Sequence, residues 1–287
     1  MHNGALRKMA LALTFWLALH VSTLRAQVFT NDLPLQAVTT GTNPVDFEFR
    51  ADGTLIALGN YGVGSLLSGD QGAGTRMLWF PSLAAFRAGG ITDTGASVDY
   101  WNQSNIGAYS VSFGLNNLVS AAYASGFGSG NRVIGEGATA FGGGNVASGI
   151  NSTALGQYNT ASGYISTTIG MFNTATGIYS TASGAYNTSS GYAATTIGGS
   201  NTASGMYSTA SGYYTQANAY VSFSMGYYNI GGGSPNTWVS TDPLFEIGNG
   251  TPTTPSDALI VYKNGNVTAQ GVITAAPGGD IPMYTGE

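Results

Sequence analysis

Two short segments carry residue types and spacings that could support chemistry. The segment from Gly69 to Thr75, Gly-Asp-Gln-Gly-Ala-Gly-Thr, has closely spaced glycines of the kind that cradle phosphate, but the lysine of a P-loop does not follow it. Three carboxylates, those of Asp46, Glu48 and Asp52, lie close together in sequence, yet their spacing does not match a calcium-binding loop. We interpret the first segment as a glycine-rich loop and the second as solvated carboxylates of a hairpin. The sequence therefore predicts no catalytic, cofactor-binding or metal-binding residue.

The residue types that are missing limit the chemistry further. Both histidines, His2 and His20, precede residue 27, and the chain contains no cysteine. A chain that begins after residue 26 has no imidazole base, no thiol nucleophile and no Cys/His zinc site. Glycosylation sequons at Asn151 and Asn249 are expected from an Asn-, Ser- and Thr-rich composition alone. We expect that the protein is not an enzyme.

The feature that must organise the chain is a glycine at every seventh residue from Gly107 to Gly226. Glycine fills 16 of the 18 successive positions, and Ala121 and Ala219 are the exceptions. The residue four places before each glycine alternates between Asn and Ser, so the full repeat is fourteen residues long with two unlike halves. The asparagines are at 145, 159, 173, 187 and 201, and the serines are at 152, 166, 180 and 208.

A period of seven does not indicate a coiled coil in this chain. One glycine per heptad costs a helix about 1 kcal/mol every two turns, and no pair of large aliphatic residues recurs. Threonine three places before glycine, alternation over five residues and a turn-forming glycine instead describe a short strand closed by a tight turn. Two strands and two turns make one coil, and stacked coils make a parallel β-solenoid. At about 4.8 Å per coil, the eight and a half coils predicted for residues 107–226 form a rod about 40 Å long.

The residues of the repeat also predict how the rod is stabilised. Alanine two places before glycine predicts a thin coil with a small apolar interior, so that a single chain is marginally stable. Solvent-facing ladders of Thr, Ser and Asn are expected to keep the rod soluble. An outer stripe of apolar residues one or two places after glycine predicts a homo-oligomer. Its members are Tyr158, Phe172, Tyr179, Tyr186, Tyr207, Tyr214 and Tyr228.

The repeat resembles the head repeats of YadA-like trimeric autotransporter adhesins over residues 104–229. The resemblance is carried by Ser152-Thr153-Ala154-Leu155-Gly156 and Ser166-Thr167-Thr168-Ile169-Gly170, which alternate with Asn-Thr-Ala-Ser-Gly halves. It implies a left-handed β-roll, a homotrimer and adhesive function at a bacterial surface. The coiled-coil stalk and strand-rich membrane anchor that normally follow such heads are not visible after residue 229, so the mode of attachment to the cell stays open.

The first residues have the pattern of a secretory signal peptide. Arg7 and Lys8 precede an apolar run from Met9 to Leu19, and polar residues then lead to Ala26, after which we expect cleavage. The apolar run is too short for a membrane span, so we predict none in the mature chain. The predicted organisation is a signal peptide at 1–26, an N-terminal hairpin and short-helix module at 27–103, the β-roll at 104–229 and a C-terminal hairpin module at 230–287.

Both flanking modules contain a predicted hairpin, and the two hairpins align with each other without gaps. Residues 47–59 surround the dipeptide Asp52-Gly53, and residues 259–271 surround Asn264-Gly265. The open ends of a solenoid carry unpaired main-chain groups, and we hypothesise that these hairpins belong to the modules that cover them. The alternative is that they are ordinary hairpins in unrelated loops.

A short helix is predicted over 82–89, with Ser82 as its N-cap and Gly89 as its C-terminal stop. Trp79, Phe80, Phe86 and Trp101 are expected to form a small aromatic core beside it. For Arg76 and Arg87 we favour pairing with Asp70 or Asp93 over ligand binding.

Charge argues against nucleic acid as a partner. Without residues 1–26 the chain keeps 5 basic and 13 acidic side chains, a formal net charge of −8. The favoured function is a secreted or cell-surface adhesin that binds cells, matrix or polysaccharide through many weak contacts. The alternatives are a structural fibre or spacer without a specific ligand, and a protein that binds ice or crystalline polysaccharide through its Thr ladders. The sequence names no ligand.

Overall fold

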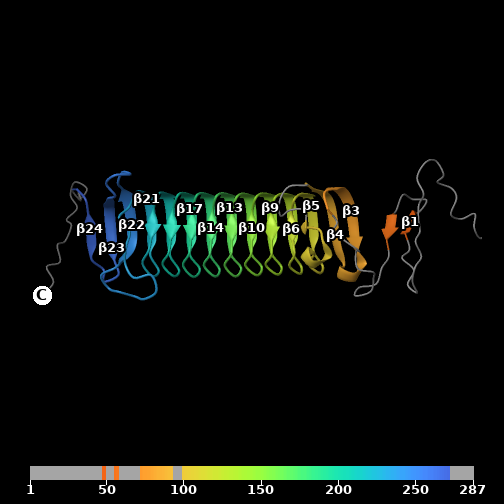
Figure 1. Ribbon diagram of the computed structural model, residues 1–287. Helices are drawn as coiled ribbons and strands as arrows, with labels where there is room; N and C mark the ends of the chain where they lie inside the picture. The colour runs from red at the N-terminus through yellow and green to blue at the C-terminus, as the bar shows by residue number, and fades with distance from the viewer. Residues whose placement is uncertain (1–46, 50–54, 58–71, 93–98, 272–287) are drawn as a thin grey trace, which may run out of the picture. The chain divides into compact units, whose positions relative to one another are not determined.

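The computed structural model describes residues 47–49, 55–57, 72–92 and 99–271, and only the backbone of the first two segments. The described chain is all-β apart from short 3₁₀ turns such as Pro81–Leu83 and Gln103–Asn105. Its centre is a parallel β-solenoid of fourteen-residue coils, which confirms the predicted fold class (Figure 1). The hand of the winding stays a prediction.

Each coil contributes one five-residue strand to the first wall of the solenoid. These long strands are β5 (Val111–Leu115), β7 (Ser125–Ser129), β9 (Thr139–Gly143), β11 (Thr153–Gln157), β13 (Thr167–Met171), β15 (Thr181–Ala185), β17 (Thr195–Gly199), β19 (Thr209–Tyr213) and β21 (Phe223–Tyr227). At its two ends this wall continues into the terminal strands, which gives one 14-stranded sheet in the order β24-β23-β22-β21-β19-β17-β15-β13-β11-β9-β7-β5-β4-β3.

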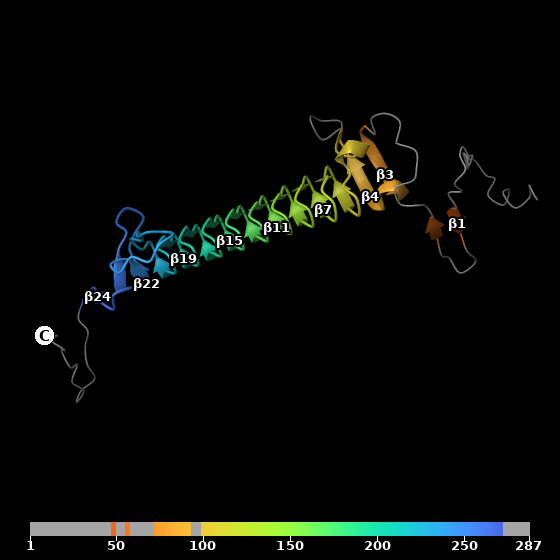
Figure 2. The ribbon, with the colours of Figure 1, turned by 90° about the horizontal axis from the view of Figure 1, so that it is seen from below.

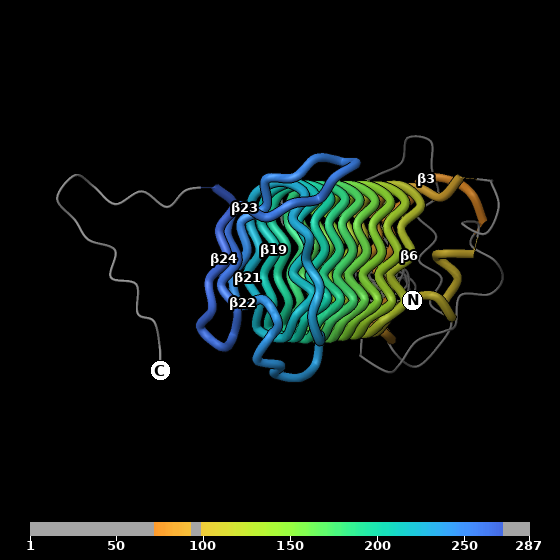
Figure 3. The backbone as a smooth tube through the Cα atoms, turned by 90° about the vertical axis from the view of Figure 1, so that its left-hand side faces the viewer, coloured from red at the N-terminus to blue at the C-terminus, as the bar shows by residue number. Residues whose placement is uncertain are grey.

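The second wall is an 8-stranded parallel sheet of two-residue strands. The short strands are β6 (Leu118–Val119), β8 (Arg132–Val133), β10 (Val146–Ala147), β12 (Thr160–Ala161), β14 (Thr174–Ala175), β16 (Thr188–Ser189), β18 (Thr202–Ala203) and β20 (Gln216–Ala217). Every strand pairs with the strand fourteen residues away, so Thr153 lies beside Thr167 and Thr160 beside Thr174. Figure 3 shows the coils as a regular series of similar turns, each displaced from the next.

The interior between the walls is narrow, as the alanines predict. Alanine two places before glycine is fully buried wherever it occurs, on the long strands as Ala154, Ala182 and Ala210 and on the short strands as Ala161 and Ala175. On one coil two larger polar residues replace alanine, and the hydroxyls of Ser189 and Thr196 lie 2.7 Å apart. The interior is therefore filled mainly by small side chains, and this pair shows that polar ones can be accommodated there.

The expectation of solvent-facing Asn and Ser ladders is wrong, because both ladders are fully buried. The amide of Asn173 donates to the main-chain oxygens of Ile169 (3.0 Å) and Gly184 (2.8 Å), and the amide oxygen of Asn173 accepts from the backbone N–H of Asn187 (3.1 Å). Asparagine thus satisfies the main-chain groups that the turn leaves unpaired. The ladder begins at Asn117 and ends where Thr215 replaces asparagine.

The chain enters the solenoid through a hairpin rather than through the predicted helix over 82–89. Strand β3 (Gly74–Phe80) pairs antiparallel with β4 (Ala85–Ile91), and β4 pairs in parallel with β5. Only Pro81–Leu83 forms a 3₁₀ turn, which ends at Ala84 in the left-handed conformation. Ala85 and Arg87 are buried in alternation, the period of a strand, and pairing with the first coil outweighs a weak helix signal.

The expected aromatic core at this end forms only in part. Phe80 and Trp101 are buried, and Phe80 packs with Ala85 and Ile106. Trp79 is largely exposed, and Phe86 lies on the outer face of the sheet, where its ring is 5.5 Å from that of Phe113. The interior at this end is therefore filled by one phenylalanine and one tryptophan rather than by four aromatic rings.

Both predicted hairpins are present, and they share one register. In β1 (Phe47–Phe49) and β2 (Leu55–Ala57), Phe47 is opposite Ala57. In β23 (Asp257–Tyr262) and β24 (Val267–Ala269), Leu259 is opposite Ala269. These are equivalent positions in the alignment of the two segments, so the sequence repeat is also a structural repeat.

The second hairpin belongs to the module that covers one edge of the solenoid sheet, as hypothesised, although the strand beside the last coil is β22 rather than a strand of the hairpin. Strand β22 (Pro243–Asn249) continues the long-strand sheet in parallel beside β21, and β23 pairs with β22 in the antiparallel direction (Figure 2). The edge of the repetitive sheet is thereby covered by a non-repetitive meander. The structure does not test the equivalent role for the hairpin at 47–57.

A buried charged side chain occupies the interior at each end of the solenoid. Arg87 is opposite Ser112 on the first coil, and Glu246 is opposite Ser224 on the last, which are the inward-facing positions of the repeat. Arg87 donates to the carbonyl oxygens of Ser110 (3.0 Å) and Val119 (2.9 Å) and to the hydroxyl of Ser110 (2.7 Å), and burial lowers its pKa to about 10. These bonds go to neutral groups rather than to the expected carboxylates, and Asp70 and Asp93 lie outside the described residues.

Glu246 terminates the opposite end. One of its carboxylate oxygens, Oε2, accepts from the hydroxyl of Ser224 (2.7 Å) and the amide of Asn229 (3.1 Å). Burial is the main reason that its pKa is raised to about 7, and the nearby carboxylate of Asp257 adds to the shift. The two ends of the interior therefore hold an arginine that donates to main-chain carbonyls and a glutamic acid that accepts from side-chain donors.

Candidate functional site: the aromatic edges of the solenoid

In each turn of the solenoid, the residue two places after the repeating glycine has the left-handed backbone conformation. The repeating glycines that follow the short strands, such as Gly163, do not have positive φ. Many of the residues in the left-handed conformation are tyrosines, such as Tyr158 (φ 54°), Tyr179 (φ 59°) and Tyr214 (φ 56°). The turn places these side chains outside the coil, where they are exposed. The predicted single outer stripe is thus divided between the two edges of the solenoid, one at each turn.

The first aromatic edge lies at the turn that follows each long strand. It consists of Tyr158, Phe172, Tyr186, Tyr214 and Tyr228. Tyr158 stacks on Phe172 with ring centroids 5.1 Å apart, Phe172 stacks on Tyr186 at 5.0 Å, and Tyr214 stacks on Tyr228 at 4.6 Å. The spacing of the rings is that of the coils.

The second aromatic edge lies at the opposite turn and has another geometry. Along the rod, its five rings come alternately from the residue one place and the residue two places after the repeat position. Neighbouring rings meet edge to face, with centroids 5.3 to 6.0 Å apart. They are Tyr164, Tyr179, Tyr192, Tyr207 and Tyr220. Edge-to-face packing is a favoured arrangement of aromatic pairs, and it leaves the phenol groups at the surface. Loss of hydration raises the pKa of Tyr192, and its neighbours Tyr207 and Tyr179 add to the shift.

The outer face of the long-strand sheet carries a third apolar feature, the apolar ridge. It is formed by the central outward residue of the long strands, which is apolar on every strand except β15 and β19, where Ser183 and Ser211 occupy the position. Phe113, Phe141, Ile169, Ile197 and Met225 are each 39 to 51 % exposed. The rings of Phe113, Phe127 and Phe141 stack in sequence at 5.4 and 4.4 Å. No residue of the ridge is charged.

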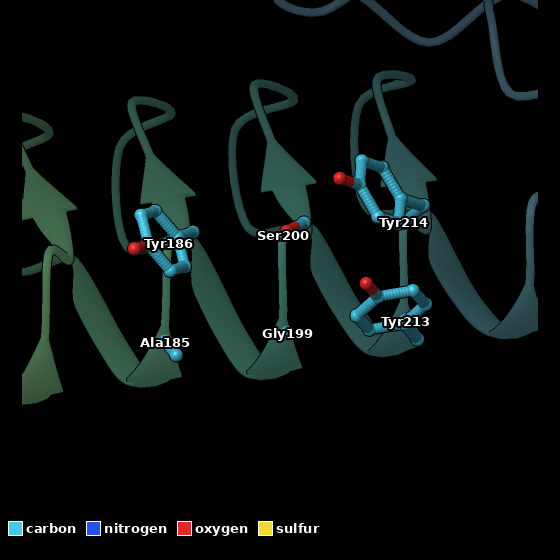
Figure 4. Close-up of a pocket in the computed structure, with 6 residues that line it drawn as sticks. All are labelled: Ala185, Tyr186, Gly199, Ser200, Tyr213 and Tyr214. Carbon is cyan, nitrogen blue, oxygen red and sulfur yellow. The ribbon is translucent and has the colours of Figure 1, made fainter.

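A hollow interrupts the first aromatic edge at Ser200. It has a volume of about 430 Å³ and is lined by Ala185, Tyr186, Gly199, Ser200, Tyr213 and Tyr214. Figure 4 shows Tyr186 and Tyr214 on either side of the coil that carries Ser200, with Tyr213 below Tyr214. A smaller hollow of about 350 Å³ lies where Gly130 and Gly144 interrupt the same edge before Tyr158.

The candidate chemistry of the sequence is not assembled into a site in the described chain. Gly72 and Gly74 precede or begin β3, and Arg76 donates to the carbonyls of Gly72 (2.9 Å) and Ala73 (2.7 Å), so this loop is tied to its own strand. Asp46, Asp52 and the side chain of Glu48 lie outside the described residues. Within the described part, no group of three or more acidic or histidine side chains is placed to hold a metal ion.

The hollow at Ser200 is what sequence reasoning missed. The signal was present in the sequence, since Ser200 interrupts a series of aromatic residues at fourteen-residue spacing that continues on both sides. Its meaning depended on the structure, because only the coil shows that Tyr186 and Tyr214 are two rungs apart on one edge.

Comparison with known proteins identifies no relative: no family model matches the chain, and no curated protein matches it significantly. Among the described residues, no helix has the length and apolar character needed to cross a bilayer.

Proposed function

We propose that this chain is a secreted or cell-surface protein of adhesin type, whose solenoid binds surfaces through repeated weak contacts of its aromatic edges. The observation that carries the proposal is the pair of exposed aromatic edges on a nearly uncharged rod. Between Trp101 and Thr241 the only charged side chains are Arg132 and Glu136. Tyrosine offers a large, rigid, amphipathic contact area at a low cost in conformational entropy, as in other recognition surfaces.

Multivalency is part of the proposal. One tyrosine contact is weak, but contacts repeated along a rigid rod raise the effective concentration of each further contact. Self-association of the chain as a homotrimer, which the resemblance to YadA-like heads implies, multiplies the number of edges again. The apolar ridge suits the interface of such a trimer, because it is uncharged and leaves both aromatic edges free.

The experiment measures adhesion of the full chain to immobilised cells, extracellular matrix and polysaccharide. We expect saturable binding, reduced at least tenfold when the second aromatic edge carries Tyr179→Asn and Tyr207→Asn. Asparagine already occupies the equivalent turn position at Asn151, with φ 56°, so the fold tolerates this change.

The matched control alters the short-strand face, with Thr174→Ser and Thr202→Ser, and should leave adhesion unchanged. A spacer without a ligand would bind none of the surfaces. That result, or equal loss of adhesion in the control, would contradict the adhesin proposal.

A further inference from the structure

The hollow at Ser200 is a missing rung in the first aromatic edge. Phe172 and Tyr186 stack with an interplanar angle of 15°, and Tyr214 and Tyr228 stack with one of 10°. Tyr186 therefore ends one stack and Tyr214 begins the next. The coil between them carries only the small side chain of Ser200, so two aromatic rings border a space that has no ring of its own.

The size of the space matches one ring. Successive parallel strands are about 4.8 Å apart, so Tyr186 and Tyr214, two coils apart, are separated by about 10 Å along the axis. Rings on adjacent coils of this edge stack at 4.6 to 5.1 Å, so one inserted ring can contact both neighbours. The occupant must be flat and present two faces that pack on aromatic rings.

The lower wall of the hollow is formed by Tyr213. Its ring meets that of Tyr214 edge to face at 4.6 Å, and it occupies space beside Gly199, where an added Cβ would lie 2.8 Å from the ring of Tyr213. The absence of a side chain at Gly199 is therefore part of the shape of the hollow. Three phenols and the hydroxyl of Ser200 line it, and none of the six lining residues is charged.

This lining suits a neutral sugar ring. A pyranose has C–H groups on its faces, which pack on aromatic rings, and hydroxyls around its rim, which pair with phenol and serine hydroxyls. Few polar groups within a mainly apolar hollow are the general pattern of small-ligand sites. A nucleotide fits poorly, because its phosphates would meet a chain of net charge −5 without a basic residue in the hollow.

We propose that the hollow bounded by Tyr186, Ser200 and Tyr214 binds one pyranose ring of a neutral polysaccharide. The inference deepens the proposed adhesive function by naming the class of ligand at one position of the first aromatic edge. The smaller hollow beside Tyr158 has one aromatic wall instead of two, and it is not part of the proposed site.

The test measures binding of neutral hexasaccharides, namely cello-, xylo-, manno- and chitohexaose, to the full chain by saturation-transfer NMR and titration. We expect at least one of them to bind. Ser200→Tyr supplies the missing ring and should lower the affinity at least tenfold. Its fold should persist, because Ser200 (φ 55°) shares its backbone conformation with Tyr186 (φ 59°) and Tyr214 (φ 56°).

Two further variants separate loss of the binding site from loss of the fold. Tyr186→Ala removes one wall at a side chain that is 57 % exposed, and it should weaken binding about fivefold or more. Asn151→Tyr is the matched control, because it adds a tyrosine in the same left-handed conformation (φ 56°) on the other edge. It should change the affinity less than twofold.

The inference is overturned if no hexasaccharide binds, or if Ser200→Tyr binds the sugars as tightly as the unmodified chain does. These outcomes are distinct from failure of the proposed function. A chain that adheres to surfaces equally with and without Ser200→Tyr retains the adhesin function and loses the sugar site. A chain that binds hexasaccharide but no surface retains the sugar site and loses the adhesin function.

Discussion

At the scale of single residues, the repeating glycines fall into two classes that differ in backbone conformation but look alike in the sequence. On the long strands it has positive φ, as at Gly156 (φ 113°), whereas at Gly163 and its equivalents it does not. Both kinds share a close approach to the next coil. A Cβ at Gly163 would lie 2.1 Å from the carbonyl oxygen of Gly177, and one at Gly156 would lie 2.0 Å from that of Gly170.

This contact predicts that Gly163→Ala destabilises the solenoid by about 2 to 3 kcal/mol, because backbone must move to admit the methyl group. Gly143 is the matched control, since its Cβ would meet only the carbonyl oxygen of Ser129, at 3.8 Å, and its φ is not positive. Gly143→Ala should be neutral or stabilising by less than about 1 kcal/mol. Denaturant unfolding of both variants measures the difference, and equal stability would show that the close approach does not require glycine.

The asparagine ladder is a second feature at this scale: the sequence predicted the ladder but not that it is buried. Asparagine alternates with serine in the repeat, and both were expected to face solvent because both are polar. Only the coil shows that the turn leaves the main-chain oxygens of residues such as Ile169 facing inward, where an amide can reach them. A polar side chain is buried here because it satisfies the backbone.

At the scale of elements, the terminal strands differ from the coils that they continue. Strand β4 extends the long-strand sheet but places Arg87 where the coils have glycine, serine, alanine or threonine. Its mixed composition, Ala-Phe-Arg-Ala-Gly-Gly-Ile, gave a misleading helix signal. This segment forms a strand because it pairs with β3 and β5, and the sequence of the segment itself carries no information about that pairing.

The C-terminal strand β22 predicts a pH dependence of stability through Glu246. Its pKa is about 4.5 in the unfolded chain and about 7 in the folded protein, so the folded state retains a proton that the unfolded chain releases. Stability is therefore greatest below about pH 4.5 for this group, falls as the pH rises towards 7, and then levels off. Asp257, whose pKa burial also raises, contributes with the same sign.

Glu246→Gln removes the titration and keeps the shape of the side chain. We expect this variant to be more stable than the unmodified chain above pH 7, by about 3 kcal/mol at most, and to show a flatter profile between pH 4.5 and 7. Glu136→Gln, at an exposed residue of the solenoid, is the control and should follow the unmodified profile. Thermal unfolding across this pH range decides the matter, and identical profiles for all three proteins would refute the role of Glu246.

At the scale of the whole molecule, the narrow interior and the exposed apolar ridge bear on the proposed self-association. The buried positions hold mainly alanine, serine and asparagine, which contribute little apolar area, while large apolar side chains lie on the outside. Burial of the ridge between copies would supply the missing apolar contact. The proposed trimer follows from this imbalance together with the resemblance of the repeats to YadA-like heads.

The ridge can be tested at Ile169, which is 43 % exposed on the long-strand face. We expect the unmodified chain to associate in solution, and Ile169→Asp to weaken the association at least tenfold, because a carboxylate would be desolvated in the interface. Thr174→Asp, on the short-strand face, should leave the association unchanged. Sedimentation over a range of concentrations measures this, and a well-folded monomer at every concentration would refute the proposed assembly.

The sequence by itself determined the repeat, the parallel solenoid and the two matched hairpins. These follow from local chemistry repeated in phase, since a strand, a tight turn and a glycine every seven residues place equivalent residues of successive coils beside one another. The alanine interior was predictable for the same reason.

Only the tertiary structure decided which polar residues are buried, which strand Arg87 occupies and how the aromatic residues are distributed. Asn173 and Thr174 are neighbours in sequence, yet one satisfies the backbone inside the coil and the other lies on its outer face. Tyr186 and Tyr214 are 28 residues apart, but they border one hollow because each coil returns the chain to the same edge. The size and shape of the coil decide which residues face inward and which residues distant in sequence become neighbours. The sequence pattern alone does not give that size and shape.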